Sequence, residues 1–402
     1  MRKLPILILF VLSQSIPAAE QWFKGNTHTH SLWSDGNDFP DMIADWYKRN
    51  GYHFLVLSDH NVLSRGERWM RVATIEKRKR GLGPSVLGKY QKRFGEEWVE
   101  LRKGANGQEV RLKNLDEVRA EFDEPGKFLM IEGEEITDKF EKAQIHINAV
   151  NVGEVVEPQH GDSVRDTMRN NLVAVREQAE RLEKPIIAHL NHPNFQWSLT
   201  AEDLAHVLEE RFFEVYNGHP GINHLGREDR PGDQEIWDIA NTLRLSELGG
   251  DLIYGVATDD SHTYHGGDVK PGRGWIMVRA EKLEADTIVR AIEAGQFYAS
   301  TGVVLEKVDF DAETNTIEIQ IAPGDDEVTV EVIGTLRGEE GDPAKVGKVL
   351  ATYNSRTIRH QLSGEEWYAR VAIQSELLHT NRSYEGQRLQ AWTQPVVPRR
   401  EK

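Results

Sequence analysis

Short apolar runs alternate with amphipathic segments along most of the chain, from Trp22 to about Thr301. Runs of four to eight apolar or alternating residues are typical of strands, and apolar positions three or four apart are typical of helices. The predicted strands span residues 22–28, 53–57, 127–131, 144–150, 185–189, 212–216, 252–258 and 275–278. The predicted helices span residues 39–50, 164–182, 201–210 and 233–248. Repeated strand–helix units favour an α/β fold closed into a (β/α) barrel, and an open doubly wound sheet is the alternative.

The pattern changes after Gly302. Six short runs, separated by Gly, Asp, Pro or Asn, span residues 303–310, 316–321, 327–333, 349–353, 368–373 and 387–392. Short strands between turn residues are typical of an all-β sandwich. We therefore expect an α/β domain over residues 20–302 and a small all-β, sandwich-like domain over residues 303–402.

A long insertion, about residues 65–125, interrupts the strand–helix alternation, and we expect it to be helical. Its first part, residues 65–93, holds ten Lys or Arg and two acids, although the formal net charge of the chain is −16. Such a basic segment is either a solvated helical face or partner contact, or a lid that attracts an anionic substrate. In the second interpretation Arg65 and Arg68 contact the substrate, together with Arg71.

Residues 1–19 are typical of a cleaved secretory signal, with Arg2 and Lys3 ahead of an apolar run and a region of small residues. The alternative is a buried N-terminal helix or an uncleaved anchor. The apolar run is shorter than the roughly 20 residues that a membrane span needs, so no span is expected after cleavage. Cleavage would change the net charge from −16 to −18, which disfavours generic binding to polyanions or membrane surfaces. The chain has no cysteine, which excludes disulfides and iron–sulfur clusters. We expect a periplasmic or secreted protein with no obligate protein partner.

Imidazoles and carboxylates recur at the ends of the predicted strands. His28 and His30 are two residues apart, so on a strand both point to the same face and can hold one metal ion. Asp35 follows in a turn that could bring a carboxylate back over that site. Asp59 and His60 come directly after an apolar strand, where barrel enzymes keep catalytic groups. Asp59 is either a ligand or an acceptor that fixes the tautomer of a metal-bound histidine.

The later motifs add further candidates for metal binding and substrate contact. Glu135 follows an apolar strand, and if that strand continues it faces away from Glu132 and Glu134, so only one of these two sets can point to the centre. His146 lies inside an alternating apolar strand. His189 and His192 are three apart, so we expect only one of them to be a ligand and the other to contact substrate or be structural. Asp260 and His262 again form a pair two residues apart after a strand, and His219 is a looser candidate for substrate contact.

As a set and in order, these motifs resemble those of the PHP (polymerase and histidinol phosphatase) family, whose metal-dependent phosphoesterases bind up to three metals in a distorted (β/α)7 barrel. The shared pattern is H-x-H, an acid or His shortly after, D-H, G-x-E, a lone strand His, H-P and D-x-H, and it covers about residues 22–302. His192, rather than His189, matches because it precedes Pro193. By this resemblance the metal ligands are His28, His30, Asp35, His60, Glu135, His146, His192, Asp260 and His262. The insertion and the C-terminal module depart from minimal family members.

The resemblance implies phosphoester hydrolysis with two or three divalent metal ions. Carboxylate and imidazole ligands without thiolates suit Zn, Mn or Fe, and clustered cations lower the pKa of a bound water from about 15.7 toward 7. Asp260 or Asp59 would then carry the proton. Arg273, which lies between two glycines, is the first choice for a phosphate contact, and a structural ion pair is its alternative.

The expected substrate is an anionic small molecule or oligonucleotide. Asp35, where some phosphatase members have a His, weakly favours the nucleotide-directed branch with 5′–3′ exonuclease-like activity. Two alternatives remain open. One is an amidohydrolase-like hydrolase of a non-phosphate substrate, because an activated water also attacks carbonyl groups. The other is a non-catalytic, metal-dependent binding protein.

Overall fold

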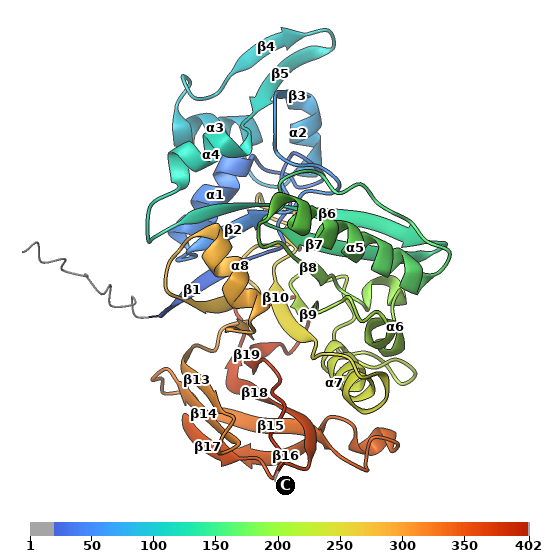
Figure 1. Cartoon of the computed structure of the whole chain (residues 1–402). Helices are drawn as coiled ribbons and strands as arrows, with labels where there is room; N and C mark the ends of the chain where they lie inside the picture. The colour runs from blue at the N-terminus through green and yellow to red at the C-terminus, as the bar shows by residue number, and fades with distance from the viewer. Residues whose placement is uncertain (1–19, 401–402) are drawn as a thin grey trace, which may run out of the picture.

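The computed structural model describes residues 20–400. Figure 1 shows three parts stacked on one another, with the inserted region above a central mixed α/β part and an antiparallel β region below it. The predicted signal peptide, residues 1–19, lies outside the described residues. Among residues 20–400, no helix is long and apolar enough to cross a membrane.

Seven strands form the central sheet around the site. They are β1 (Gln21–Asn26), β2 (Phe54–Leu57), β6 (Leu129–Phe140), β7 (Ala143–Val150), β8 (Ile187–Leu190), β9 (Phe212–Asn217) and β10 (Tyr254–Thr258). They pair in the order β10-β9-β8-β7-β6-β2-β1. All neighbours in this row are parallel except β7, which is antiparallel to both β6 and β8. The two outer strands of the row approach each other beyond their carboxyl ends, where Thr29 and Ser261 form a parallel bridge.

The expected alternation of strand and helix is wrong at β6. The strand does not stop near Ile131 but continues to Phe140 and turns directly into β7. This long hairpin replaces a strand–helix–strand unit. The second half of β6 contains polar residues such as Glu134 and Asp138, which are buried and form hydrogen bonds with residues outside the strand. Because the apolar run stops before these residues, it did not mark the true end of the strand.

Helices cover the outer face of this sheet. They are α1 (Pro40–Arg49), α4 (Leu115–Phe122), α5 (Val164–Leu182), α6 (Ala201–His206), α7 (Asp233–Leu243) and α8 (Ala285–Glu293), and a π-helical turn (Arg244–Leu248) extends α7. The helix predicted for residues 164–182 is confirmed, and its Met168, Leu172 and Val175 pack into the outer core. The inner face of the sheet is polar instead, with fully buried Asn148, His189 and Glu214.

The inserted region was expected to be helical, but it also contains strands. Besides α2 (Val72–Arg78) and α3 (Val86–Phe94) it contains β3 (Arg68–Arg71), β4 (Leu101–Gly104) and β5 (Gly107–Leu112), which form an antiparallel sheet in the order β3-β5-β4. The region packs on the loop that follows β1. Phe39 of that loop stacks on Tyr90 of α3 with ring centroids 3.9 Å apart, next to Trp33 and Ile75 in one apolar cluster.

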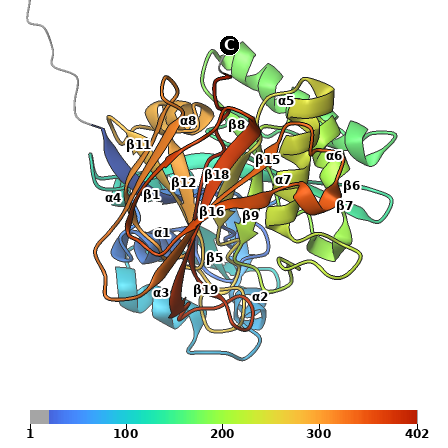
Figure 2. The ribbon, with the colours of Figure 1, turned by 90° about the horizontal axis from the view of Figure 1, so that it is seen from below.

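The C-terminal β region contains two antiparallel sheets. Strands β11 (Trp275–Ala280) and β12 (Phe297–Ser300) extend the central sheet from β1, and β19 (Arg388–Thr393), β18 (Glu366–Leu378), β15 (Val328–Leu336) and β16 (Lys348–Tyr353) continue it. The second sheet contains β13 (Leu305–Asp311), β14 (Thr316–Ile321) and β17 (Thr357–Gln361), and a short 3-10 helix (Pro343–Lys345) precedes β16. Ile319, Val332 and Val371 belong to one apolar core between the two sheets. Figure 2 views the region from below.

A buried ion pair joins this region to the central part. Nη2 of Arg370 in β18 lies 2.6 Å from Oδ2 of Asp238 in α7, and both side chains are almost fully buried. The sheet runs on from β12 into β19, and the predicted boundary at residue 302 lies in the connection between β12 and β13.

Candidate metal centre

Histidine and acidic side chains converge where the strands of the central sheet end. His28 and His30 follow β1, His60 follows β2, and His192 follows β8. In the described residues, four overlapping groups of side chains could each hold a metal ion. Together they contain all nine residues predicted as ligands and no other residue: His28, His30, Asp35, His60, Glu135, His146, His192, Asp260 and His262.

Four donor atoms form the innermost part of this cluster. Nε2 of His28 lies 3.1 Å from Nε2 of His30, 3.4 Å from Oε2 of Glu135 and 3.3 Å from Oδ1 of Asp260. Nε2 of His30 lies 3.3 Å and 3.2 Å from the same two oxygens. Ligand atoms about 2.0–2.1 Å from a tetrahedral cation lie about 3.3–3.4 Å from one another. The distances that His28 and His30 make with each carboxylate match this spacing, and the groups compact enough for one cation are His28, His30 and Glu135, and His28, His192 and Asp260.

Glu135 connects this group to a second one. Its Oε1 lies 3.0 Å from Nδ1 of His146 and 3.6 Å from Nε2 of His192, while its Oε2 belongs to the innermost group. Oε2 of Glu135 and Nε2 of His146 are buried and have no hydrogen-bond partner. Buried polar atoms without a partner are costly, so a cation between these side chains is a physical explanation for them. A carboxylate with one oxygen in each group suits two neighbouring cations.

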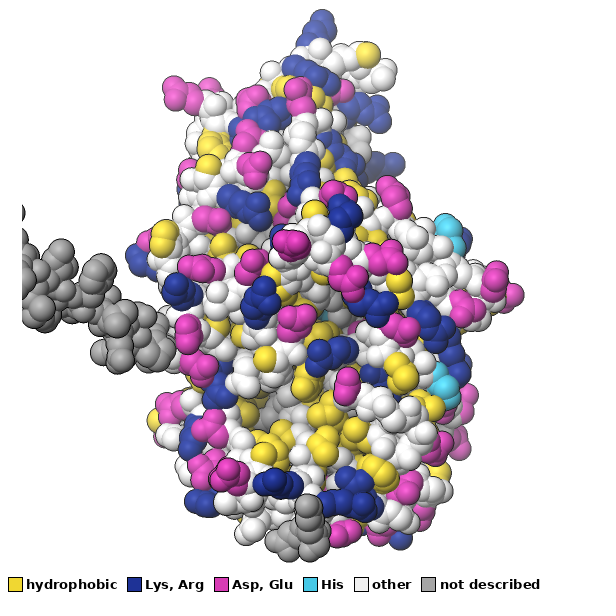
Figure 3. Space-filling view, viewed as in Figure 1, with side chains coloured by type: hydrophobic (Ala, Val, Ile, Leu, Met, Phe, Trp, Pro, Cys, Tyr) yellow, Lys and Arg dark blue, Asp and Glu magenta, His cyan; other side chains and the backbone are white. Residues whose placement is uncertain are grey.

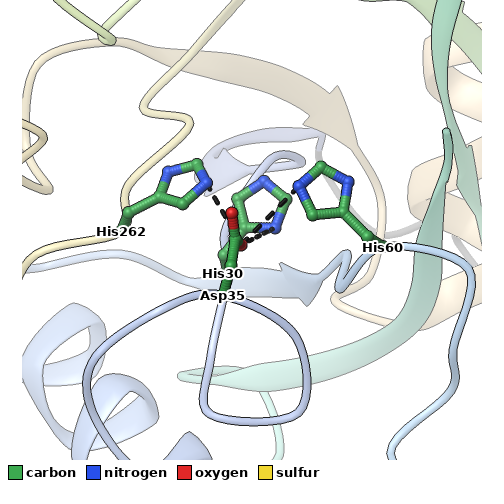
Figure 4. Close-up of side chains that lie close together, drawn as sticks. All are labelled: His30, Asp35, His60 and His262. Carbon is green, nitrogen blue, oxygen red and sulfur yellow. Dashed lines mark ion pairs between the residues drawn. The ribbon is translucent and has the colours of Figure 1, made fainter. Parts of the chain in front are cut away.

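A third group lies at the mouth of the cluster. Figure 4 shows the carboxylate of Asp35 between the rings of His60 and His262, with His30 behind it. Oδ1 of Asp35 lies 3.3 Å from Nε2 of His262, 3.6 Å from Nε2 of His60 and 3.7 Å from Nδ1 of His30. The side chain of Asp35 is 56% exposed, so this group is open to solvent. The turn after His30 thus brings Asp35 back over the site, as the sequence predicts.

Two of the ligands sit on strained backbone. His192 and Asp260 have φ angles of 26° and 46°, in the left-handed region that side chains with a Cβ rarely adopt. Such conformations cost about 1–3 kcal/mol each and persist only where the surrounding structure enforces them. Here backbone contacts do so, because Asp260 N donates to the carbonyl oxygen of His28 (3.0 Å) and His192 N donates to Glu214 (2.8 Å).

Acceptors outside the cluster orient its imidazoles. Nδ1 of His28 lies 2.7 Å from Oε1 of Glu214, and Nδ1 of His262 lies 2.9 Å from the carbonyl oxygen of Asp260. A ring that donates from Nδ1 leaves Nε2 free to bind a cation. Glu214 was missed in the sequence. The signal that could have found it is a single acid inside the apolar run of β9, since a buried acid needs a partner.

The carboxylates of the cluster are held in their charged form. Burial alone would raise the pKa of Glu135 and Asp260, but the surrounding imidazoles hold the pKa of both well below its usual value. Burial, followed by the charges of His262 and His60, lowers the pKa of His30 to about 4. Burial lowers the pKa of His28, His192 and His262, but the neighbouring carboxylates outweigh it and hold all three above their usual value. Because imidazoles bind cations in their neutral form, a cation that enters the cluster displaces protons from these rings.

Asp59 does not touch the ligand imidazoles, contrary to both roles predicted for it. Its carboxylate accepts hydrogen bonds from the backbone N and Oγ of Ser31 (2.8 and 2.6 Å) and of Ser34 (3.0 and 2.6 Å). These four bonds occupy the side chain and leave it 1% exposed. Asp59 therefore holds the loop that carries Asp35 in position.

The predicted substrate-binding residues are dispersed. Arg65 pairs with Glu132 (2.6 Å), and Arg68 donates to the carbonyl oxygen of Trp33 (2.5 Å). Fully buried His189 contacts Oγ1 of Thr27 (3.0 Å) and does not line the cavity over the cluster.

The guanidinium of Arg273 also forms hydrogen bonds away from the cavity. Arg273 is 4% exposed, and its guanidinium donates to the carbonyl oxygens of Gly218 (2.7 Å) and Asn381 (3.1 Å). The prediction that Arg273 binds phosphate does not agree with this placement, because its donors are used to hold loops together.

A cavity of about 780 Å³ opens over the cluster. Seven of the nine candidate ligands line it, and so does His219, as predicted. Its other walls include Phe195, from the short 3-10 helix (Phe195–Trp197), and Arg78, Lys79 and Arg80 of the inserted region. The basic side chains that face the site are therefore not those singled out in the sequence.

No model of a known protein family matches this sequence, and no curated protein matches it. Among solved structures, it resembles a two-domain protein from Bacteroides vulgatus containing a predicted PHP-like metal-dependent phosphoesterase. The identity is 14%, the TM-score is 0.40, and the match covers 93% of this chain and 95% of that one.

Two further structures each match 60% of this chain and 87% of their own. One, from Bifidobacterium adolescentis, is named as a metal-dependent phosphoesterase, with 12% identity and a TM-score of 0.31. The other is an amidohydrolase from Chromobacterium violaceum with bound sulfate and no metal, with 13% identity and a TM-score of 0.28. At these TM-scores the likenesses support no conclusion about function, which rests on the site itself.

Proposed function

We propose that this protein is a metal-dependent hydrolase of phosphate esters, with nucleotides or oligonucleotides as substrates. The observation that carries the proposal is the innermost group of His28, His30, Glu135 and Asp260. His28 and His30 lie 3.1–3.4 Å from each other and from one oxygen of each of the two carboxylates, and the other oxygen of Glu135 lies near His146 and His192. The distorted (β/α)7 barrel implied by the sequence resemblance belongs to the same proposal. The bridge between the ends of the strand row supports closure on the side of the site.

Two or three divalent cations, Zn, Mn or Fe, would supply a water that ionises near neutral pH and would neutralise charge on the phosphoryl oxygens. The chain supplies the remaining functions. Asp260 is held in place by Asn217, whose Nδ2 donates to Oδ2 (3.1 Å), and this orients Oδ1 toward the innermost group, where it would bind a cation. The polar inner face of the sheet, with Asn148 and His189, closes the site from below.

His219 has the geometry of a hydrogen-bond donor to the substrate. Its Nδ1 accepts a hydrogen bond from the backbone N of Gly221 (2.9 Å), so its proton lies on Nε2. Burial is the largest effect on its pKa, and this pKa lies below its usual value, so the ring is neutral at neutral pH. The ring lines the cavity 5.9 Å from that of His262, and Nε2–H is therefore available to a phosphoryl or leaving-group oxygen.

The proposal is tested on purified mature protein. Metal content is measured by elemental analysis, and release of p-nitrophenol is followed from p-nitrophenyl phosphate and bis-p-nitrophenyl phosphate. We expect bound divalent metal, activity that a chelator abolishes, and recovery with Zn, Mn or Fe. The variant Glu135→Gln should lose both metal and activity, while His206→Gln, on the exposed surface of α6, should lose neither. Metal-replete protein that hydrolyses neither phosphate ester would overturn the proposal.

We also propose that the protein is exported and acts in the periplasm or outside the cell. Support comes from the charged start, apolar run and small-residue region of residues 1–19. N-terminal sequencing of the protein from its native cell tests this. Cleavage near Ala19 is expected, and an intact Met1 on all of the cellular protein would contradict it.

A further inference from the structure

One wall of the cavity comes from the inserted region. Arg78 ends α2, and Lys79 and Arg80 follow it, and all three line the same cavity as the candidate metal ligands. Figure 3 shows Lys and Arg side chains gathered over the upper right of the molecule, where the inserted region lies. The insertion therefore contributes directly to the site as well as to the surface.

This wall is held in position by contacts on both sides. Nη1 of Arg78 donates to the carbonyl oxygen of Gly36 (2.9 Å), the residue after Asp35. Nζ of Lys79 donates to the carbonyl oxygen of Gly83 (3.2 Å). Gly83 has a φ of 65°, and a Cβ there would lie 2.8 Å from the carbonyl oxygen of His265, so the segment packs closely on the loop after His262. The basic groups thus have a defined place relative to the cluster.

The charges of the wall are largely unpaired. Other basic residues of the insertion have close acidic partners, such as Lys89 with Asp38 (2.8 Å) and Arg93 with Asp45 (2.6 Å). Lys79 has only a distant one, Glu76 at 3.8 Å. Arg78 and Arg80 form no ion pair with the part of the chain that the structure describes. In a protein with a net charge of −16, unpaired positive groups beside a cavity point to an anionic ligand.

We infer that Arg78, Lys79 and Arg80 bind a second phosphate of the substrate, beyond the ester at the metal centre. The inference rests on the proposed function, since the cluster takes the ester that is hydrolysed. A single phosphate needs only a small part of a cavity of about 780 Å³ that reaches from the cluster to the insertion. Asp268 and Asp35 also line the cavity, and their carboxylates repel an anion that comes close to them.

An aromatic ring lines the same space. Phe195 is partly exposed, and its ring centroid lies 5.2 Å from that of His192 and 6.4 Å from that of His219. Aromatic faces stack on nucleobases, which have a π face of their own. The site therefore suits a nucleotide with two phosphates, with its base or sugar passing Phe195.

The first test compares thymidine 5′-phosphate with the dinucleotide pTpT, which adds a second phosphate together with a second nucleoside, so that the contribution of the phosphate is read from the variants below. We expect wild-type kcat/KM to be about tenfold higher for pTpT, as for a charge-assisted contact to phosphate. In the double variant Arg78→Gln/Arg80→Gln, the ratio of the two kcat/KM values should fall toward 1. In Arg80→Lys, which keeps the positive charge, the ratio should stay close to that of wild type. The matched control is Lys77→Gln/Lys103→Gln, which removes two exposed charges from the inserted region away from the cavity.

The second test needs no turnover. Binding of fluorescein-labelled pTpT to protein in EDTA is followed by anisotropy from 50 to 300 mM salt. For single strands the slope of log K against log salt changes by about 0.7 for each phosphate that the protein no longer neutralises, so the Arg78/Arg80 variant should have a shallower slope than the control. An unchanged ratio and slope would overturn the inference. Absence of any phosphate hydrolysis, with the slope still reduced, would overturn the proposed function and leave the anion-binding wall standing.

Discussion

Glu214 and His28 form a buried pair beneath the metal centre, with Oε1 of Glu214 2.7 Å from Nδ1 of His28 and both side chains 0% exposed. The same carboxylate accepts hydrogen bonds from Oγ1 of Thr258 (2.6 Å) and from the backbone N of His192 (2.8 Å). It thereby ties three strand ends together. Burial opposes the ionised form, but His28 and the other imidazoles lower the pKa of Glu214 to about 2, so it is charged.

The first prediction concerns this pair. Glu214→Gln should weaken divalent metal binding by about 10–100-fold, because partners behind a ligand imidazole orient it and raise its basicity. Competition titration with a metal indicator measures the change. The matched control is Glu210→Gln, a buried acid just ahead of the same strand that touches no ligand. Equal affinity in Glu214→Gln and wild type would show that Glu214 does not support the centre.

Divalent metal should stabilise the fold as well as enable catalysis. Nε2 of His28 and Nε2 of His30 are buried and lie 3.1–3.4 Å from each other and from the carboxylates of Glu135 and Asp260, an arrangement that is costly without a cation. A ligand present at 100 times its Kd adds about 2.7 kcal/mol, which for a protein of this size corresponds to a rise in Tm of several degrees, at about 2 °C per kcal/mol. Differential scanning calorimetry with Zn or Mn, against EDTA, gives the shift. Glu135→Gln should abolish it and His206→Gln should keep it.

Asp59 should behave as a positioning residue and not as a proton carrier. Asp59→Ala removes the acceptor of four hydrogen bonds from Ser31 and Ser34, which should lower the free energy of unfolding by about 2–4 kcal/mol. The loop that carries Asp35 then loosens, and metal affinity of the outer group falls. Asp59→Asn should retain most of the stability.

The pH profile distinguishes the two roles of Asp59. If Asp59 only positions the loop, the plot of kcat against pH keeps its shape in Asp59→Asn at saturating metal, although kcat is lower. Loss of one limb of that profile in Asp59→Asn, with metal content unchanged, would restore the proton-carrying role.

The ligand set could be predicted from the sequence because its information is local. His28, His30 and Asp260 lie at or just after the ends of predicted strands, and parallel strands bring such positions to one edge of a sheet. Helix α5 was predictable for a similar reason, since its apolar positions repeat with helical period and Ser163 caps its start. Here periodicity and tertiary structure agree.

The remaining features depend on contacts far apart in the chain. Whether Arg78 or Arg273 points into the cavity is decided by Gly36, Gly218 and Asn381, which no local pattern reveals. The β6–β7 hairpin was missed because buried polar residues in its strands broke the apolar run.

The last prediction concerns pH-dependent stability and Glu210. Its Oε1 accepts hydrogen bonds from the backbone N of Arg211 and Phe212 (both 2.9 Å), while Oε2 is buried without a hydrogen-bond partner. Burial raises the pKa of Glu210 from about 4.5 to about 8, and the two backbone bonds and Arg244 only partly oppose this. Between these two values the folded protein binds a proton that the unfolded chain has released. The contribution of Glu210 to the free energy of unfolding is therefore complete below pH 4.5. This contribution, roughly a few kcal/mol, is lost as the pH rises toward 8.

Glu210→Gln keeps a side-chain oxygen for both backbone bonds and cannot ionise. Relative to wild type, its free energy of unfolding in urea should therefore rise progressively between pH 5 and pH 8.5, in EDTA to exclude metal effects. Other titrating groups, including Glu134, act equally in both proteins and cancel in the difference. Glu177→Gln, exposed on α5, is the control and should show a difference that does not change with pH. If the difference in the free energy of unfolding between Glu210→Gln and wild type also does not change with pH, the prediction is wrong. Arg244 would then keep the Glu210 carboxylate ionised in the folded protein, although Oε2 has no hydrogen-bond partner.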